Sequence, residues 1–350
     1  MFFRRIDAVN YLEYFLVSAI AAVLIIRLFL ELTGYPQVGG DTLHIAHMLW
    51  GGLFMLVALF LLFSFIGRVI ENISAIIGGI GFGTFIDEIG KFVTQDNDYF
   101  FQPSVALIYL VFILIYLVIR AIHRKSEYSP QEYLLNALRE IEELAINDLD
   151  IEEKKRAIDY LDRSGFQAPL ANSMKKVLLE TTVRSIPPDN LYQNTKAYIR
   201  SAYQKIAVLP AFKYVIIAFF LFKFITQFLF IIILIFFKGA GWEKILNLQI
   251  FQDLIDKSGR LSFVEGAEIL SASISGVFTF LGIWLLPKSR IRAYRMFERS
   301  ILISIFVTQV FVFYKEQFGA LVGLILNIFI LLGVQFMISR EHKTNPPVKS

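Results

Sequence analysis

Long apolar stretches separated by short polar segments dominate this sequence. A membrane-spanning helix needs about 20 mainly apolar residues, because the hydrocarbon layer is about 30 Å thick and a helix rises about 1.5 Å per residue. Eight stretches reach or approach that length, which predicts an all-α, polytopic transmembrane helical bundle of about eight spans. The predicted spans are Tyr11–Leu32, Leu43–Ile66, Val69–Ile86, Pro103–Ile122, Tyr214–Phe237, Gly266–Leu286, Ser300–Tyr314 and Phe318–Ser339.

Two of these spans are atypical. The third, Val69–Ile86, is short and glycine-rich and carries Glu71 and Asn72, so both a full crossing and a re-entrant segment are open. The seventh, Ser300–Tyr314, is short, and we expect its ends to snorkel or the bilayer to thin around it. The first apolar run is not followed by a small-residue cleavage site and is interpreted as a retained span.

A polar insert, residues 126–209, separates the fourth and fifth spans and predicts a small helical domain of four short helices. Ser129 and Glu132 form a capping box with proline at the first helical position, Asp150 begins a second helix, and Gly165 ends it. The predicted domains are a membrane domain at 1–125, the insert at 126–209, a second membrane domain at 210–340 and a tail at 341–350.

Basic residues gather in loops that fall on one side of an eight-span chain. Cytoplasmic loops are enriched in lysine and arginine, so this side is predicted to face the cytoplasm, with both termini and the insert. The opposite loops are poorer in basic residues, apart from the long stretch 238–260. The predicted location is the bacterial cytoplasmic (inner) membrane. The basic residues that set this orientation are Arg4, Arg5, Arg120, Arg124, Lys125, Lys288, Arg290, Arg292, Arg295, Arg299, Arg340, Lys343 and Lys349.

Composition supports a membrane protein. Hydrophobic residues make up 56% of the chain and charged residues 18%, against about a quarter in soluble domains. The formal net charge of +4 follows the loops, which favours a topological role for the basic residues over nucleic-acid binding. The chain has no cysteine, which excludes disulfides, a thiol nucleophile and cysteine-ligated metals.

Three polar clusters lie at span ends on the predicted outer side. Polar side chains at or within spans are costly, so they suggest function. Topology alone is expected to bring the clusters together, although they are far apart in the sequence. They are His44 and His47 at the start of the second span, Asp87 and Glu88 at the end of the third, and Glu265 and Glu268 at the start of the sixth.

These residue types match several kinds of chemistry. His44 and His47 share one helix face and, with Asp87 and Glu88, could ligate a divalent transition metal such as zinc, iron or manganese, Glu265 and Glu268 forming a second tier. A neutral imidazole beside a carboxylate could instead act as a general base or proton relay. A purely structural, hydrated polar cluster is the third interpretation. The other polar residues assigned to the site are Arg27, Lys91, Asp96, Asp98 and Lys223.

Two of these basic residues have specific predicted roles. Arg27 is expected to face Asp87 or Glu88 and hold it ionised, or else to pair with Glu31 one turn away. Lys223, near the middle of the fifth span, either snorkels toward the inner face or lines a polar path. Asn327 and Gln335 of the eighth span are its expected neighbours in the second case.

Glycines in the third span suggest close helix packing. Gly79 and Gly83 are one turn apart, which would let a neighbouring helix approach, and Gly51 and Gly52 of the second span are the expected partners. The surrounding GxGxG string is not a dinucleotide motif, because no strand precedes it.

Three functions remain open from the sequence. The first is a membrane-embedded, metal-dependent enzyme that acts on a lipid or isoprenoid at the outer leaflet. The second is a transporter or ion-conducting protein. The third is a membrane scaffold or sensor that signals through a cytoplasmic protein partner of the insert, residues 126–209. Membrane lipid is an expected partner in each case, and nucleic acid is not.

Overall fold

The protein, described here by a computed structural model, is helical, with no β-strand in the part of the chain that the structure describes, so the all-α class is confirmed. The described residues are 3–34, 46–95, 101–124, 128–145, 149–165, 169–182, 191–239 and 262–344. The chain forms two compact units, each described by itself. The first contains Met1–Phe101 and Val111–Asn190, and the second contains Gln102–Leu110 and Leu191–Ser350.

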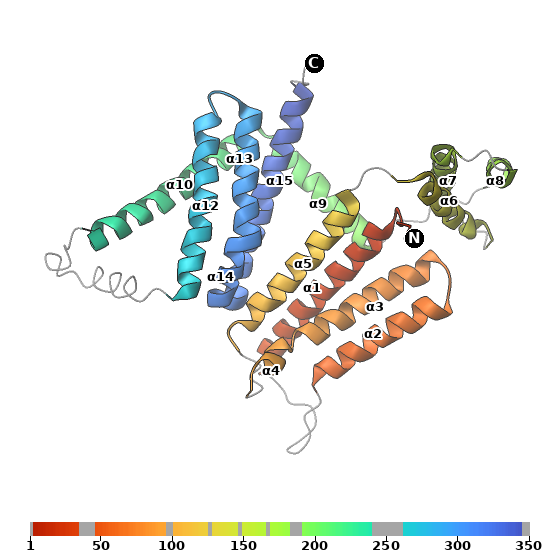
Figure 1. Ribbon diagram of the computed structural model, residues 1–350, viewed down its shortest axis with the longest axis horizontal. Helices are drawn as coiled ribbons and strands as arrows, with labels where there is room; N and C mark the ends of the chain where they lie inside the picture. The colour runs from red at the N-terminus through yellow and green to blue at the C-terminus, as the bar shows by residue number, and fades with distance from the viewer. Residues whose placement is uncertain are drawn as a thin grey trace. The chain divides into compact units, whose positions relative to one another are not determined.

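Helix α3 is the central element of the first unit. It packs against both α1 and α2, as Figure 1 shows, and a short helix, α4, follows it. Helix α5 is divided between the two units, and its part from Val111 onward belongs to this one. The bounds are α1 (Ala8–Thr33), α2 (His47–Ser64), α3 (Arg68–Ile86), α4 (Ile89–Val93) and α5 (Ser104–Arg124).

Glycines on two faces of α3 allow this packing. A Cβ atom built on Gly79 would lie 2.0 Å from a side-chain oxygen of α1, and one on Gly83 would lie 2.2 Å from a carbonyl oxygen of the same helix. On another face, a Cβ on Gly81 would lie 2.7 Å from the carbonyl oxygen of Gly51 in α2. Close packing was predicted correctly, but Gly79 and Gly83 contact α1 and not α2, the expected partner.

Adjacent glycines of α2 provide a test of this close approach. A Cβ on Gly51 would lie 2.6 Å from the backbone nitrogen of Phe85, which cannot rotate away, whereas a Cβ on Gly52 would meet nothing within 4 Å. Gly51→Ala is therefore expected to destabilise the protein by about 1–3 kcal/mol. Gly52→Ala shares the gain in helix propensity without the clash and should be neutral or slightly stabilising. Thermal unfolding in detergent measures both, and equal melting temperatures would contradict the prediction.

The helices that follow α5 begin and end largely as their sequence signals predict. The Asp150 side chain accepts a hydrogen bond from the Glu153 amide and the Glu153 side chain accepts one from the Asp150 amide, while Gly165 ends the helix with a φ of 63°. The helices of the first unit here are α6 (Pro130–Ala145), α7 (Ile151–Ser164) and α8 (Pro169–Glu180). Their apolar core consists of Ala137, Leu149, Ala157, Leu161, Ala171 and Leu178.

The second unit is a further set of long helices. Helix α9, which lies within the predicted insert, clusters with this unit. Phe220 of α10 stacks on Phe297 of α13 at a centroid distance of 4.2 Å, in the core of this unit. The helices are α9 (Leu191–Val208), α10 (Pro210–Gly239), α12 (Phe263–Leu285), α13 (Arg290–Ile303), α14 (Gln309–Glu316) and α15 (Ala320–Thr344).

The predicted seventh span is longer than its apolar core. Helices α13 and α14 are joined by a π-helical turn at Ser304–Thr308, so helical backbone continues from Arg290 to Glu316. The basic residues that precede Ser300 lower the local hydropathy but are compatible with a helix, which explains why the apolar window underestimated it. The apolar part of this helix is still short, so the expected snorkelling of its ends or thinning of the bilayer stays a prediction. At Gln317, with a φ of 50°, the chain turns into α15.

Six segments of the described chain are long and apolar enough to cross a membrane, which is typical of a membrane-embedded protein. The doubtful third span is one of them, as a continuous helix of 19 residues. Large apolar side chains remain exposed on most of these helices, as expected for surfaces that face lipid. The segments are Ala8–Thr33, His47–Ser64, Arg68–Ile86, Ser104–Ile122, Phe263–Leu285 and Arg290–His342.

Candidate functional site at the two ends of helix α3

A buried carboxylate lies at the C-terminal end of α3. Asp87 directly follows the helix and is fully buried, because the glycines of α3 bring α1 and α2 close on either side. Arg27 of α1 donates from Nε to Asp87 Oδ1 at 2.6 Å and from Nη2 to the Asp87 carbonyl oxygen at 2.9 Å. His47 of α2 contacts Asp87 Oδ2 through Nε2 at 3.1 Å. The expected contact between Arg27 and Asp87 is confirmed.

A second buried carboxylate, Glu88, lies beside it. The amide of Met48, in the first turn of α2, donates to Glu88 Oε2 at 2.9 Å, so this side chain caps a helix N-terminus, where a negative charge is favoured. Lys91 of α4 donates to Glu88 Oε1 at 2.6 Å. His47 Nδ1 lies 3.6 Å from the same oxygen. We call Arg27, His47, Asp87, Glu88 and Lys91 the His47 cluster.

The charges of the His47 cluster balance when its imidazole is neutral, since two cations, Arg27 and Lys91, face two carboxylates, Asp87 and Glu88. Both ring nitrogens of His47 face carboxylate oxygens. A neutral imidazole has one N–H and one lone pair, so one of these contacts would place a lone pair against an oxygen. Proton uptake turns both nitrogens into donors. The geometry thus makes His47 the group through which a proton would change this cluster.

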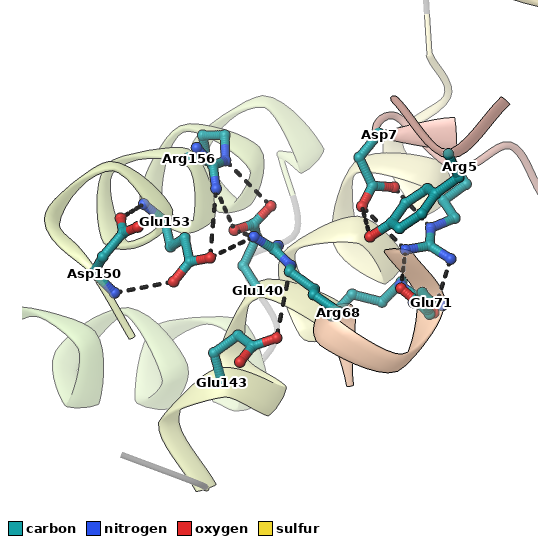
Figure 2. A network of polar contacts seen from close by, with 11 residues as sticks. Arg5, Asp7, Arg68, Glu71, Glu140, Glu143, Asp150, Glu153 and Arg156 are labelled. Carbon is teal, nitrogen blue, oxygen red and sulfur yellow. Dashed lines mark hydrogen bonds and ion pairs between the residues drawn. The ribbon is translucent and has the colours of Figure 1, made fainter. Parts of the chain in front are cut away.

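A larger ionic network lies at the opposite, N-terminal end of α3 (Figure 2). Glu71, in the first turn of the helix, accepts hydrogen bonds from Arg5, which precedes α1, and from Arg139 of α6. Arg5 also pairs with Asp7 at 2.7 Å and lies over the ring of Tyr11. Residues that are far apart in the sequence therefore meet around one α3 carboxylate.

Arg68, the first residue of α3, contacts three carboxylates of α6 and α7 (Figure 2). Its guanidinium lies 2.7 Å from Glu140, 2.6 Å from Glu153 and 3.7 Å from Glu143. The three carboxylates are largely buried, and Arg156 of α7 approaches two of them. We call this set the Arg68 network; it consists of Arg5, Asp7, Arg68, Glu71, Arg139, Glu140, Glu143, Glu153 and Arg156. No sequence pattern was interpreted above as this network, although the acidic residues clustered in α6 and α7 indicate a basic partner.

A further ion pair, between Arg4 and Glu132, gives a pH prediction. Hydrogen bonds from Arg4 lower the pKa of Glu132 from 4.5 to about 2. A carboxyl group whose pKa is lower in the folded than in the unfolded protein stabilises the fold at pH values above its unfolded pKa. This contribution disappears as the pH falls through the folded pKa. The melting temperature of the wild-type protein should therefore be higher than that of Glu132→Gln at neutral pH. The difference between the two melting temperatures should shrink as the pH falls from about 4.5 to about 2. A difference that does not change over this range would contradict the assignment.

The remaining predicted site residues are distributed as follows. His44, Asp96 and Asp98 lie outside the described residues. In the second unit, Glu265 caps α12 together with Ser262, and Glu268 pairs with Lys315 at 3.0 Å. Over the described ranges no group of three or more His, Asp or Glu side chains is placed to hold a metal ion, and the metal site stays a prediction.

Lys223 is held by hydroxyl groups in the second unit. Its Nζ donates to Ser275 Oγ of α12 at 3.0 Å and to Ser304 Oγ at 2.7 Å. Ser275 also lies 2.9 Å from Ser300 Oγ, and Thr279 lies 2.8 Å from the same oxygen. The expected neighbours of Lys223 have other partners, since Asn327 bonds Gln309 and Gln335 bonds Glu298. The spacing of Ser271, Ser275 and Thr279, one turn apart on α12, was the sequence signal for these hydroxyls.

No protein-family model, curated protein or solved structure matches the chain. What the site can do is therefore inferred from its own residues.

Proposed function

We propose that the protein is a sensor in the cytoplasmic (inner) membrane, which transmits a change in the His47 cluster through α3 to the helical insert and its cytoplasmic protein partner. The observation that carries this proposal is that one helix has a charge cluster at each end. Asp87 at one end pairs with α1 and α2, and Arg68 and Glu71 at the other pair with α6 and α7. Close packing through glycines favours movement of α3 as one body.

The proposed topology has eight spans, with both termini and the insert in the cytoplasm. It is supported by the six candidate segments, of which Arg290–His342 contains two helices, α13–α14 and α15, that turn back at Gln317. Helix α10, 30 residues long with lysines only at 213, 223 and 238, adds the eighth. The positive-inside bias then places the His47 cluster outside. A reporter that works only in the cytoplasm should be active when fused after Asp150, and inactivity there would reverse the orientation.

The proposed input is a proton taken up by His47 from the outer side. The His47 side chain is 26% exposed, whereas Asp87 and Glu88, the two carboxylates that it faces, are fully buried. Among these three side chains, a proton from water therefore reaches the imidazole first. Adding one positive charge to a balanced cluster changes the attraction between α2 and the end of α3. A signal also requires two conformations of the protein that bind the proton with different affinities. We propose that these conformations differ in the ionic contacts at both ends of α3.

The proposal can be tested with paired spin labels. The chain has no cysteine, so Phe65→Cys, directly after α2, and Leu179→Cys on α8, both exposed in the structure, give a unique label pair. We expect the distance distribution between the labels in lipid nanodiscs to differ between pH 5 and pH 8. The pH-dependent change should be lost in His47→Gln.

His342→Gln is the matched control. It removes a histidine of the second unit, which contacts Arg295, and leaves the His47 cluster intact, so the pH-dependent change should persist. A change that survives His47→Gln, or the absence of any change in the otherwise unaltered labelled protein, would refute the sensor proposal.

A transporter is the second candidate, and Lys223 favours it. Polar side chains within a span often line a path for an ion, and here an ammonium group meets a series of hydroxyls beside the π-helical turn Ser304–Thr308. Uptake of protons or anions by proteoliposomes that is lost in Lys223→Met and retained in His47→Gln would support this function instead.

A further inference from the structure

A groove of about 530 Å³ runs between α1 and α2, with α3 as its floor. This volume is within the range of about 300–1,000 Å³ that small-molecule sites occupy. Small residues make the floor deep, and larger apolar side chains form the walls. The floor consists of Ser74, Ala75 and Gly78 with Ala58 beside them, and the walls consist of Leu12, Phe15, Met55, Leu59 and Leu62.

One polar atom in this apolar lining lacks a partner. The Oγ atom of Ser74 has no hydrogen-bond partner, and the residue is only 2% exposed. A buried hydroxyl without a partner costs about 1–3 kcal/mol, and serines in helices usually avoid that cost by bonding a carbonyl one turn back. An acceptor inside the groove would satisfy Ser74. This observation is independent of the shape of the groove and indicates a ligand with an oxygen at that depth.

The groove has one polar end. Arg5, Tyr11 and Glu71 line it there, and they belong to or adjoin the Arg68 network. A cation and an anion side by side suit a polar head that carries both charges. The opposite part of the groove, around Met55 and Gly78, has only apolar walls. The groove is therefore amphipathic along its length.

We propose that this groove binds one acyl chain of a zwitterionic glycerophospholipid. Ser74 lies three residues beyond Glu71, about 4.5 Å of helix rise deeper in the groove. A glycerophospholipid presents a charged head, then an ester carbonyl, then a hydrocarbon chain, in the same order as Glu71, Ser74 and the apolar floor at Gly78. The ester carbonyl accepts the hydrogen bond from Ser74, and the chain covers the small residues. This site is separate from the His47 cluster and does not depend on the sensor function.

Native mass spectrometry of the full-length protein tests this proposal, with palmitoyl-oleoyl phosphatidylethanolamine as the probe. We expect one tightly retained lipid per chain. Ala75→Phe fills the groove and should abolish this retention. Ile76→Phe adds the same ring to the next residue of α3, which is 40% exposed and does not line the groove, and it should leave retention unchanged.

Ser74→Ala keeps the shape of the groove and removes only the hydroxyl. Lipid affinity should fall by about two- to tenfold, the value of one net hydrogen bond. The melting temperature of the delipidated protein should be preserved or raised, because without lipid the Ser74 hydroxyl is buried and unpaired. Equal retention by Ala75→Phe and Ile76→Phe would overturn the proposal. So would a lipid-free dimer of the wild type that Ala75→Phe breaks, since a second copy would then occupy the groove.

Discussion

Arg68→Ala is expected to release α6 and α7 from α3. The substitution leaves Glu140, Glu143 and Glu153 largely buried without the guanidinium that lies among them. Removing one partner of a buried ion pair costs about 3–5 kcal/mol, because the remaining charges stay desolvated. We therefore expect backbone amides of α6 and α7 to exchange hydrogen at least about 100-fold faster, as in a local opening. Hydrogen exchange followed by mass spectrometry measures this.

Arg163→Ala is the matched control for Arg68→Ala. Arg163 pairs with Asp159 on the exposed face of α7 and also lies over the ring of Tyr133 in α6, 5.8 Å from its centroid. Exposed contacts of these two kinds contribute about 0–1 kcal/mol each, well below the cost expected for Arg68→Ala. Exchange in α6 and α7 should therefore hardly change in this variant. If Arg68→Ala and Arg163→Ala gave the same exchange rates, the Arg68 network would not hold the insert on α3, and the proposed route of the signal would fail with it.

Asp87→Ala should destabilise the opposite end of α3 by a similar amount. Arg27 is 13% exposed on its side chain and would lose its buried carboxylate partner, at a cost of about 3–5 kcal/mol. Thermal unfolding of the purified protein should show a large fall in melting temperature. Glu31→Ala, an exposed acidic position one turn from Arg27, should change the melting temperature little.

A double substitution distinguishes the contribution of the charges of Arg27 and Asp87 to stability from that of their packing. Arg27→Met with Asp87→Ala removes both charges, so most of the loss should be recovered, since apolar replacements of buried pairs are often neutral. The double-mutant cycle then gives a coupling energy of more than about 1 kcal/mol. Additive losses from the two single substitutions would show that the pair is not coupled.

Much of the local structure follows from the sequence, because its signals act over a few residues. Apolar length predicted the helices now observed at α1, α2, α3 and α5, and a hydrogen-bonding side chain predicted where α7 begins. Glycine spacing predicted that α3 packs closely. The length of α13–α14 was underestimated, because charged residues at its start hide a continuous helix from an apolar window.

The candidate site was only partly predictable, because pairing between distant side chains depends on how helices pack. The sequence identified Arg27, His47, Asp87 and Glu88 as functional candidates, since polar groups at span ends are rare. It did not determine that Asp87 lies between Arg27 and His47, which follows from glycine contacts on two faces of α3. Nor did it predict the partners of Lys223, because the regular spacing of hydroxyl groups on α12 does not say which side chain of another helix meets them.

Taken alone, the sequence determined that this chain is an all-helical membrane protein with polar groups at the ends of its second and third apolar helices. The reason is that helix formation and membrane insertion depend on local apolar length and on capping residues. Only the tertiary structure decided that α3 connects two charge clusters and that Ser74 is left without a partner in an apolar groove. These features arise where segments far apart in the sequence meet, and no local pattern encodes that meeting.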